Sequence, residues 1–169
     1  DNYWLKQSNL LRWNQKPSLA FKKKEDNYID WYPDGKINIF DNFITKNIDA
    51  GLGKKIAIHC ISKNKKIKSY TYDKINKQVN LFSSLLISQL KNKNLSLCRV
   101  MIHSSASIES SISMLSCTKL GIHFSVIFED LAPEAISKRI SLFKPNIFFS
   151  NFSKKLFKRN ILKNIKLKV

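Results

Sequence analysis

The chain has 169 residues, and 30 Lys and Arg against 12 Asp and Glu give it a formal net charge of +18. This length fits one domain, or one domain with an appendage, and the apolar content of 43% is ordinary for a globular protein. No stretch approaches the roughly 20 uninterrupted apolar residues of a transmembrane helix, and the N-terminus carries no signal-peptide pattern. We therefore expect no membrane partner and a cytoplasmic location, and a chain that starts at Asp1 rather than Met is expected to be an incomplete piece of a longer one.

The high positive charge raises the possibility of nucleic-acid binding. Lysine greatly outnumbers arginine, however, and it occurs together with abundant Asn and Ile, which share A/T-rich codons. Genome composition explains this bias without selection for a polyanionic partner. A nucleic-acid site also favours Arg forks and exposed aromatic side chains between basic ones. We keep a basic nucleic-acid-binding domain only as a third hypothesis.

The chain lacks the common short motifs of catalysis and metal binding. Its three cysteines are odd in number and far apart, which favours reduced thiols over a disulfide framework or a zinc site. Single histidines within strands more often have a structural role than a catalytic one. The sequence has no Gly-x-Ser-x-Gly elbow and no glycine-rich phosphate loop, and it has only four glycines. The residues concerned are Cys60, Cys98, Cys117, His59, His103 and His123.

The first third of the chain shows no sustained hydrophobic period. Residues 3–13 carry spaced aromatic and Leu side chains that predict one short amphipathic helix ending before Pro17. Residues 21–27 are polar and predict a loop, and Pro33-Asp34-Gly35 predicts a turn between two apolar patches. Bulky aromatic residues without periodicity indicate a segment that packs on something larger.

From Lys55 onward the pattern becomes regular. Residues 55–61 and 66–71 alternate and predict a β-hairpin, and Thr71 is placed to cap a helix over the following 19 or so residues. Further strands are predicted at 97–103, 122–128 and 146–150. The helices between them end at Gly121 and begin at Pro133.

Strands that alternate with helices and consist of nearly continuous apolar runs are typical of a parallel sheet covered on both faces. The predicted fold class is therefore α/β, with a parallel sheet and helices on both faces. An irregular, aromatic-rich N-terminal segment and a β-hairpin precede this sheet. The last strand is expected to expose an edge of the sheet unless other residues or a partner cover it. Residues 154–169 are basic and could hold one more short helix.

Several stretches together resemble the N-terminal part of the AMP-forming acetyl- and propionyl-CoA synthetases, which are adenylate-forming enzymes. Their order and spacing match along nearly the whole chain. The stretches are Tyr3-Trp4 through Trp13 and Pro17, Trp31-Tyr-Pro-Asp-Gly-Lys-Ile-Asn38 with Asn42, Tyr70-Thr-Tyr72, Met114-Leu-Ser-Cys-Thr-Lys-Leu-Gly121, Ser125-Val-Ile-Phe128, and Ala132-Pro-Glu-Ala135 through Arg139-Ile140.

The resemblance implies a two-step ligase, in which ATP and a short carboxylate form an acyl-adenylate and coenzyme A then displaces AMP. ATP, Mg and coenzyme A are implied for a full-length relative, and the remainder of a synthetase chain is the implied partner. The family's phosphate loop and adenylation lysine come later than this chain reaches, so no catalytic residue is assigned and this fragment alone is expected to be inactive. Residues 1–50 would form the family's N-terminal segment, and residues 51–169 the first part of its AMP-binding domain. Acetate and propionate both stay open, and a non-catalytic α/β remnant or protein-interaction module is the main alternative.

The resemblance places a coenzyme A site at the turn after residues 122–128. Phe128 matches the aromatic residue of the family's Phe-Gly-Gly turn, and Arg159 falls near one of the family's coenzyme A arginines. Both glycines of that turn are replaced here, by Glu129 and Asp130. Their like charge would repel coenzyme A phosphates. We expect this turn to bind coenzyme A weakly or not at all, and the two carboxylates to cap the next helix instead.

Overall fold

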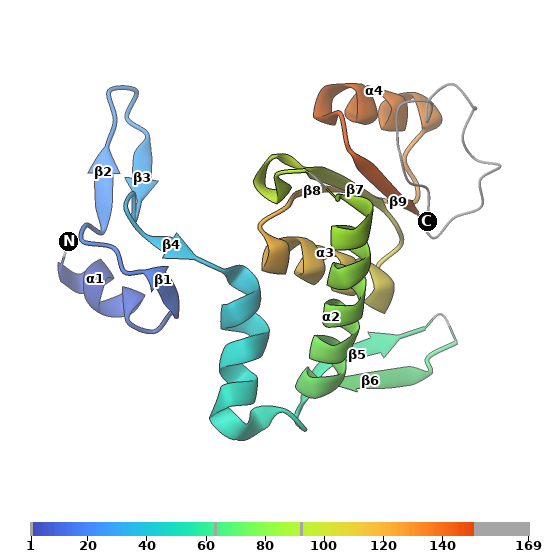
Figure 1. Cartoon of the computed structure of the whole chain (residues 1–169), viewed down its shortest axis with the longest axis horizontal. Coiled ribbons are helices and arrows are strands. Elements are labelled where there is room, and N and C mark those ends of the chain that lie inside the picture. The colour runs from blue at the N-terminus through green and yellow to red at the C-terminus, as the bar shows by residue number, and fades with distance from the viewer. Residues whose placement is uncertain (1, 63, 92, 151–169) are drawn as a thin grey trace.

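A computed structural model describes residues 2–62, 64–91 and 93–150. Its elements form an N-terminal part, a linking helical segment, a projecting hairpin and an α/β part (Figure 1). The α/β part, built from residues 72–150, holds the only parallel sheet of the described ranges.

The N-terminal part consists of short elements held together by aromatic contacts. Helix α1 (Asn2–Ser8) is followed by two small antiparallel pairs, β1 (Trp13–Gln15) with β4 (Lys36–Ile37) and β2 (Phe21–Lys23) with β3 (Ile29–Trp31). The ring of Trp31 lies 5.4 Å from that of Trp4 and 5.6 Å from that of Phe21. The aromatic residues thus pack against one another rather than against the sheet of the α/β part.

Two expectations for this part are corrected. The predicted helix ends at Ser8 rather than before Pro17, because Trp13 already starts a strand. The indole N–H of Trp13 donates to the Ser8 carbonyl over 2.8 Å. Residues 21–23 form a strand rather than a loop, since their backbone pairs with that of residues 29–31. The turn predicted at Pro33-Asp34-Gly35 is confirmed, with the Gly35 N–H donating to the Tyr32 carbonyl over 2.9 Å.

A helical segment that the sequence did not predict links the N-terminal part to the rest. It contains two wide π-helical turns, η1 (Asp41–Thr45) and η2 (Ile48–Leu52). Phe40 and Ile44 are buried, and Ile48 packs against the same cluster. One apolar side chain every fourth residue therefore anchors this segment.

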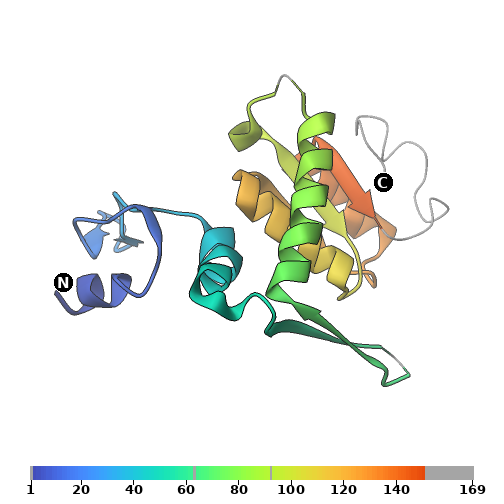
Figure 2. The ribbon, with the colours of Figure 1, turned by 60° about the horizontal axis from the view of Figure 1, so that its bottom comes forward.

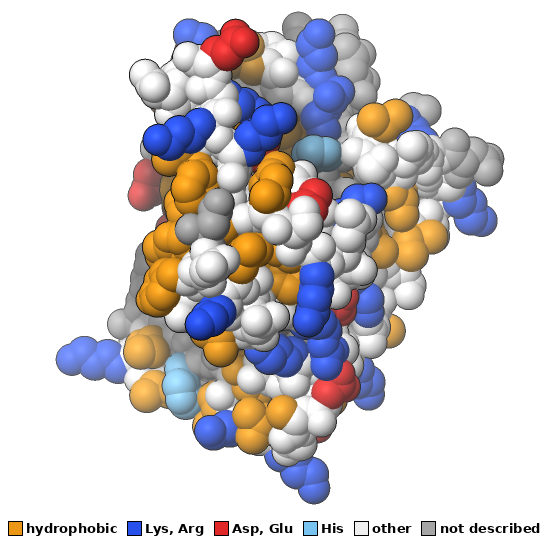
Figure 3. All heavy atoms as spheres, turned by 90° about the vertical axis from the view of Figure 1, so that its left-hand side faces the viewer, with side chains coloured by type: hydrophobic (Ala, Val, Ile, Leu, Met, Phe, Trp, Pro, Cys, Tyr) orange, Lys and Arg blue, Asp and Glu red, His pale blue; other side chains and the backbone are white. Residues whose placement is uncertain are grey.

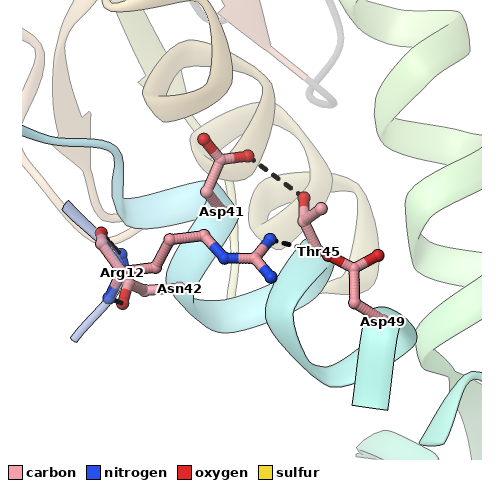
Figure 4. Close-up of polar contacts among 5 residues, drawn as sticks. All are labelled: Arg12, Asp41, Asn42, Thr45 and Asp49. Atoms are coloured by element: carbon pink, nitrogen blue, oxygen red, sulfur yellow. Dashed lines mark hydrogen bonds and ion pairs between the residues drawn. The ribbon is translucent and has the colours of Figure 1, made fainter. Parts of the chain in front are cut away.

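A side-chain joint fixes the N-terminal part to this segment (Figure 4). Asn42 accepts the Arg12 backbone N–H and donates to the Arg12 carbonyl, both over 2.8 Å, so its amide mimics a strand partner. The Arg12 guanidinium also pairs with Asp49 at 2.7 Å, and Thr45 donates to Asp41 over 3.1 Å.

The predicted hairpin and its following helix are confirmed. Strands β5 (Ile56–Ile61) and β6 (Ile67–Thr71) pair antiparallel, and α2 (Tyr72–Gln89) starts directly after them. The Thr71 hydroxyl accepts the Lys74 backbone N–H over 3.3 Å, which satisfies one of the free donors of the helix N-terminus.

The parallel sheet has the order β8-β7-β9, so the first of its strands in the chain lies at the centre. Its strands are β7 (Arg99–His103), β8 (His123–Ile127) and β9 (Ile147–Ser150). A short 3-10 turn, η3 (Leu95–Leu97), precedes β7. Helices α3 (Ile108–Leu120) and α4 (Pro133–Phe143) connect the strands.

Helices cover both faces of this sheet, as predicted (Figure 2). Val100 and Ile102 face the cluster that includes Leu86 of α2 and Cys117 of α3. Met101, the residue between them, faces α4. This alternation follows from the period of two in a strand.

Among the described residues, no helix combines the length and apolarity that a bilayer span requires.

Candidate functional site

The candidate site is an open cavity of about 630 Å³ at the carboxyl end of β7, between the hairpin and the start of α3. Ligands of open α/β sheets usually bind outside the carboxyl ends of the strands. One wall comes from β5, a second from the β7–α3 connection and the first turn of α3, and a third from the end of β8. The lining residues are Ile58, His59, Cys60, Ile61, Ser104, Ser105, Ala106, Ser107, Ser110, Ser111, Met114, Val126 and Phe128.

The lining combines apolar side chains with serine hydroxyls, and it includes no Lys, Arg, Asp or Glu. Its serines gather at the start of α3. The Ser107 hydroxyl accepts the Ser110 backbone N–H over 3.2 Å and so caps α3. The lining therefore suits an uncharged or weakly polar group better than a phosphate.

His103 ends β7 close to this cavity, and it is buried. Its Nδ1 lies 3.2 Å from the hydroxyl of Ser150, at the end of β9. This contact links the carboxyl ends of two neighbouring strands, β7 and β9. Burial lowers the pKa of His103, and the nearby Glu129 carboxylate partly opposes this by favouring the imidazolium. The imidazole is therefore held in its neutral form at neutral pH. His59 lines the cavity from β5, where it is exposed with its Nδ1 2.8 Å from the Ser69 hydroxyl, whereas His123 lies at the start of β8.

The turn after β8 carries the proposed coenzyme A residue. The Phe128 side chain is 68% exposed at the rim of the cavity, next to the exposed Glu129 and Asp130. The expected capping by the two carboxylates is wrong, because α4 has Ala132 at its N-cap position without any side-chain cap, and Glu134 is the acidic residue of its first turn. Arg159, the second predicted site residue, lies outside the described residues.

The cavity and the turn beside it do not suit the phosphates of ATP or coenzyme A. The cavity lining has no Lys or Arg, and the turn beside it carries two exposed carboxylates, whose charge repels a phosphate. Within residues 2–150, apart from the two undescribed positions, no group of three or more His, Cys, Asp or Glu is placed to hold a metal ion. Phe128 could supply only apolar contact.

Sequence reasoning missed most of the cavity walls. Ile58 and Cys60 lie on β5, and Met114 lies on α3, so residues far apart in the chain form the cavity. The polar run that directly follows the buried strand β7 was the one signal that could have located it. The three cysteines have free thiols, as predicted.

The fold and the cavity together define an α/β domain with a parallel sheet and a site at the carboxyl end of its strands. A solved structure described as "Crystal structure of CmiS6" has the same fold over 71% of this chain and 28% of its own, with a TM-score of 0.60 and 16% identity.

Sequence comparisons show which proteins this chain resembles. Residues 1–43 match the family model "Acetyl-coenzyme A synthetase N-terminus". An acetyl-coenzyme A synthetase of Streptomyces coelicolor is 26% identical over 82% of this chain, and one of Leptospira biflexa is 29% identical over 87%. The human protein "Acyl-CoA synthetase short-chain family member 3, mitochondrial" is 26% identical over 87%.

These comparisons confirm the predicted resemblance to the N-terminal part of the AMP-forming acetyl-CoA synthetases. The chain spans about a fifth of the length of these relatives, with 21% of the Streptomyces protein and 22% of the Leptospira protein covered.

Proposed function

We propose that this chain is the N-terminal part of a short-chain acyl-CoA synthetase, an acid-thiol ligase. The full reaction would convert acetate or propionate, ATP and coenzyme A into acyl-CoA, AMP and pyrophosphate. The observation that carries this proposal is similarity to acetyl-CoA synthetases in one continuous order along 82–87% of the chain. The chain would work together with the remainder of a synthetase, in the cytoplasm and without nucleic acid.

Within such an enzyme, residues 1–50 would form the N-terminal segment, and residues 51–169 would begin the AMP-binding domain. Phe128 and Arg159 would line the route of coenzyme A. The chain alone would be inactive, because a triphosphate needs its charge neutralised and held in line, and the cavity lining has no cationic group. The binding of ATP and Mg would therefore depend on residues beyond this chain.

A non-catalytic α/β module is the second candidate, and one observation favours it. Glu129 and Asp130 stand exposed at the turn where the family keeps two glycines. Two carboxylates there oppose coenzyme A binding, which a working synthetase needs.

The test is carboxylate-dependent exchange of pyrophosphate into ATP. We expect none from the 169-residue chain with acetate or propionate. A protein extended by whatever the coding sequence specifies past Val169 should catalyse the exchange and form acyl-CoA. A stop codon soon after Val169, or an extended protein without exchange, would favour the non-catalytic module. Pyrophosphate exchange by the 169-residue chain itself would contradict the proposal that this chain alone is inactive.

A further inference from the structure

The tip of the β5–β6 hairpin exposes two apolar side chains side by side. Ile61 and Ile67 are directly paired across the two strands, and they are 70% and 65% exposed. On the other face of the hairpin, Ile58 and Cys60 are half-buried and pack against the cluster that contains Tyr70 and Ile75. The two isoleucines thus form the apolar end of a ribbon whose base is anchored in the protein core.

Lysines surround this apolar tip. Residues 54–71 contain six Lys and no Arg, Asp or Glu. Lys65, Lys66 and Lys68 are exposed at the same end of the hairpin. Lys66 and Lys68 lie on the opposite face of the ribbon from Ile67, because side chains alternate along a strand. The Lys68 ammonium also lies 5.4 Å from the ring centre of Tyr70, and Glu109 of α3 is the acidic group that acts on it from a neighbouring element. The tip therefore carries a local excess of positive charge around a small apolar patch.

The hairpin projects away from the helices and the parallel sheet (Figures 1 and 2). A planar surface could reach its tip without displacing any other described element. The chain's net charge of +18 would attract such a surface if it were anionic.

We propose that this tip docks on an anionic lipid membrane surface. The hairpin end enters the boundary between headgroups and acyl chains with Ile61 and Ile67. The long side chains of Lys65, Lys66 and Lys68 extend around this end to the lipid phosphates. Apolar groups buried at this depth and lysines near anionic lipids are the two contributions that hold proteins on a bilayer surface without spanning it. The expectation of no membrane partner rested on spanning helices, and this surface mode does not need one.

Lipid fits the tip better than nucleic acid does. Nucleic-acid sites use aromatic side chains for stacking and Arg for bidentate phosphate contacts. Ile61 and Ile67 cannot stack on bases, and the hairpin has no Arg. A polyanion in water would leave both isoleucines exposed.

The test is flotation of the 169-residue chain with phosphatidylcholine vesicles, with or without about one-third phosphatidylserine. We expect binding to the anionic vesicles only, weakened by added salt because screening shortens the reach of the charges. Ile61→Ser with Ile67→Ser, and separately Lys66→Glu with Lys68→Glu, should each weaken binding by about tenfold or more. This test needs no substrate, so it is independent of the synthetase proposal.

Matched controls lie on the helices. Leu81 and Leu142 are 66% and 74% exposed, and Lys138 is exposed on α4. Leu81→Ser with Leu142→Ser should leave vesicle binding nearly unchanged. The same holds for Lys138→Glu with Lys77→Glu, which changes the exposed Lys77 of α2 and so matches the charge change of the hairpin variant. Circular dichroism establishes that each variant is folded. No binding to anionic vesicles would overturn the proposal, as would equal binding to neutral ones or hairpin variants that bind like the controls. Displacement from vesicles by an equal charge of single-stranded DNA would also overturn it, because the tip would then be a general polyanion site.

Discussion

At the scale of single residues, the turn after β8 carries the clearest departure from the synthetases that the chain resembles. Glu129 and Asp130 lie exposed at the end of a sheet strand, next to the exposed Phe128 ring. Helix α4 has Ala132 at its N-cap position and no side-chain cap hydrogen bond, so neither carboxylate caps it. Their main effect on an approaching phosphate is repulsion.

Replacing both carboxylates should improve coenzyme A binding. We expect Glu129→Gly with Asp130→Gly, made in the extended protein, to tighten coenzyme A binding by roughly tenfold, because two repelling charges are removed. Isothermal titration measures the affinity directly. Glu134→Gln on the first turn of α4 is the control for a general change of charge, and an unchanged affinity in the double glycine variant would refute the interpretation of this turn.

The Cys117 thiol should be inert in the folded protein. It is buried between α3 and the sheet, and burial raises its pKa to about 12, so the reactive thiolate is absent at neutral pH. The half-buried Cys60 should react first with iodoacetamide, and Cys117 only after denaturant is added, as mass spectrometry can measure. The folded pKa lies above the ordinary 9.0, so the thiol's contribution to stability is complete below that pH and is lost as pH rises toward 12. Equal alkylation of both thiols in the native protein would contradict this.

At the scale of elements, local sequence signals predicted the regular half of the chain. Thr71 caps α2 with its side-chain oxygen, and Gly121 ends α3 with a φ of 66°, a conformation that suits glycine. Pro133 begins α4, where its missing N–H costs no hydrogen bond. The strand at Phe21–Lys23 was missed because its sequence is polar and has no strand pattern. Only the backbone pairing with residues 29–31 makes it a strand.

The helical segment before the hairpin and the walls of the cavity escaped prediction for related reasons. Phe40, Ile44 and Ile48 recur every fourth residue, a spacing that fits wide helical turns and departs from the usual pattern of three and four. The cavity depends on how the hairpin packs beside α3, and no local signal encodes such a long-range contact.

Helix α2 offers a test of how its buried face stabilises the fold. Leu86 is 1% exposed in the core cluster against the sheet, whereas Leu81 on the same helix is 66% exposed. Leu86→Ala should lower the free energy of unfolding by about 2–5 kcal/mol, because it removes buried methyl groups and leaves a cavity. Leu81→Ala should change it by less than about 0.5 kcal/mol. Denaturant unfolding followed by circular dichroism measures both, and equal losses would show that the helix does not pack as described.

At the scale of the whole molecule, the N-terminal part depends on few contacts with the rest. Its tryptophans and tyrosines leave wide areas exposed, with Trp4 at 45% and Trp31 at 48%. Figure 3, which views the molecule from this side, shows hydrophobic side chains gathered between Lys and Arg side chains. Besides the Asn42 joint, the Asn38 amide donates to the Lys119 carbonyl at the end of α3 over 3.2 Å. A part attached in this way should detach without unfolding the sheet.

Removing the Asn42 amide should loosen the N-terminal part selectively. Asn42→Ala deletes both hydrogen bonds to the Arg12 backbone, which leaves that N–H and carbonyl without their strand-like partner. Arg12→Ala deletes only the ion pair with Asp49, whose two side chains are 42% and 53% exposed, and such surface pairs contribute about 0–1 kcal/mol. Hydrogen exchange should therefore speed up across residues 2–37 much more in Asn42→Ala than in Arg12→Ala, while amides of β7 keep their protection in both. Loss of protection in β7 would mean that the joint supports the whole fold, and equal effects of the two variants would mean that the ion pair, rather than the amide, holds the N-terminal part in place.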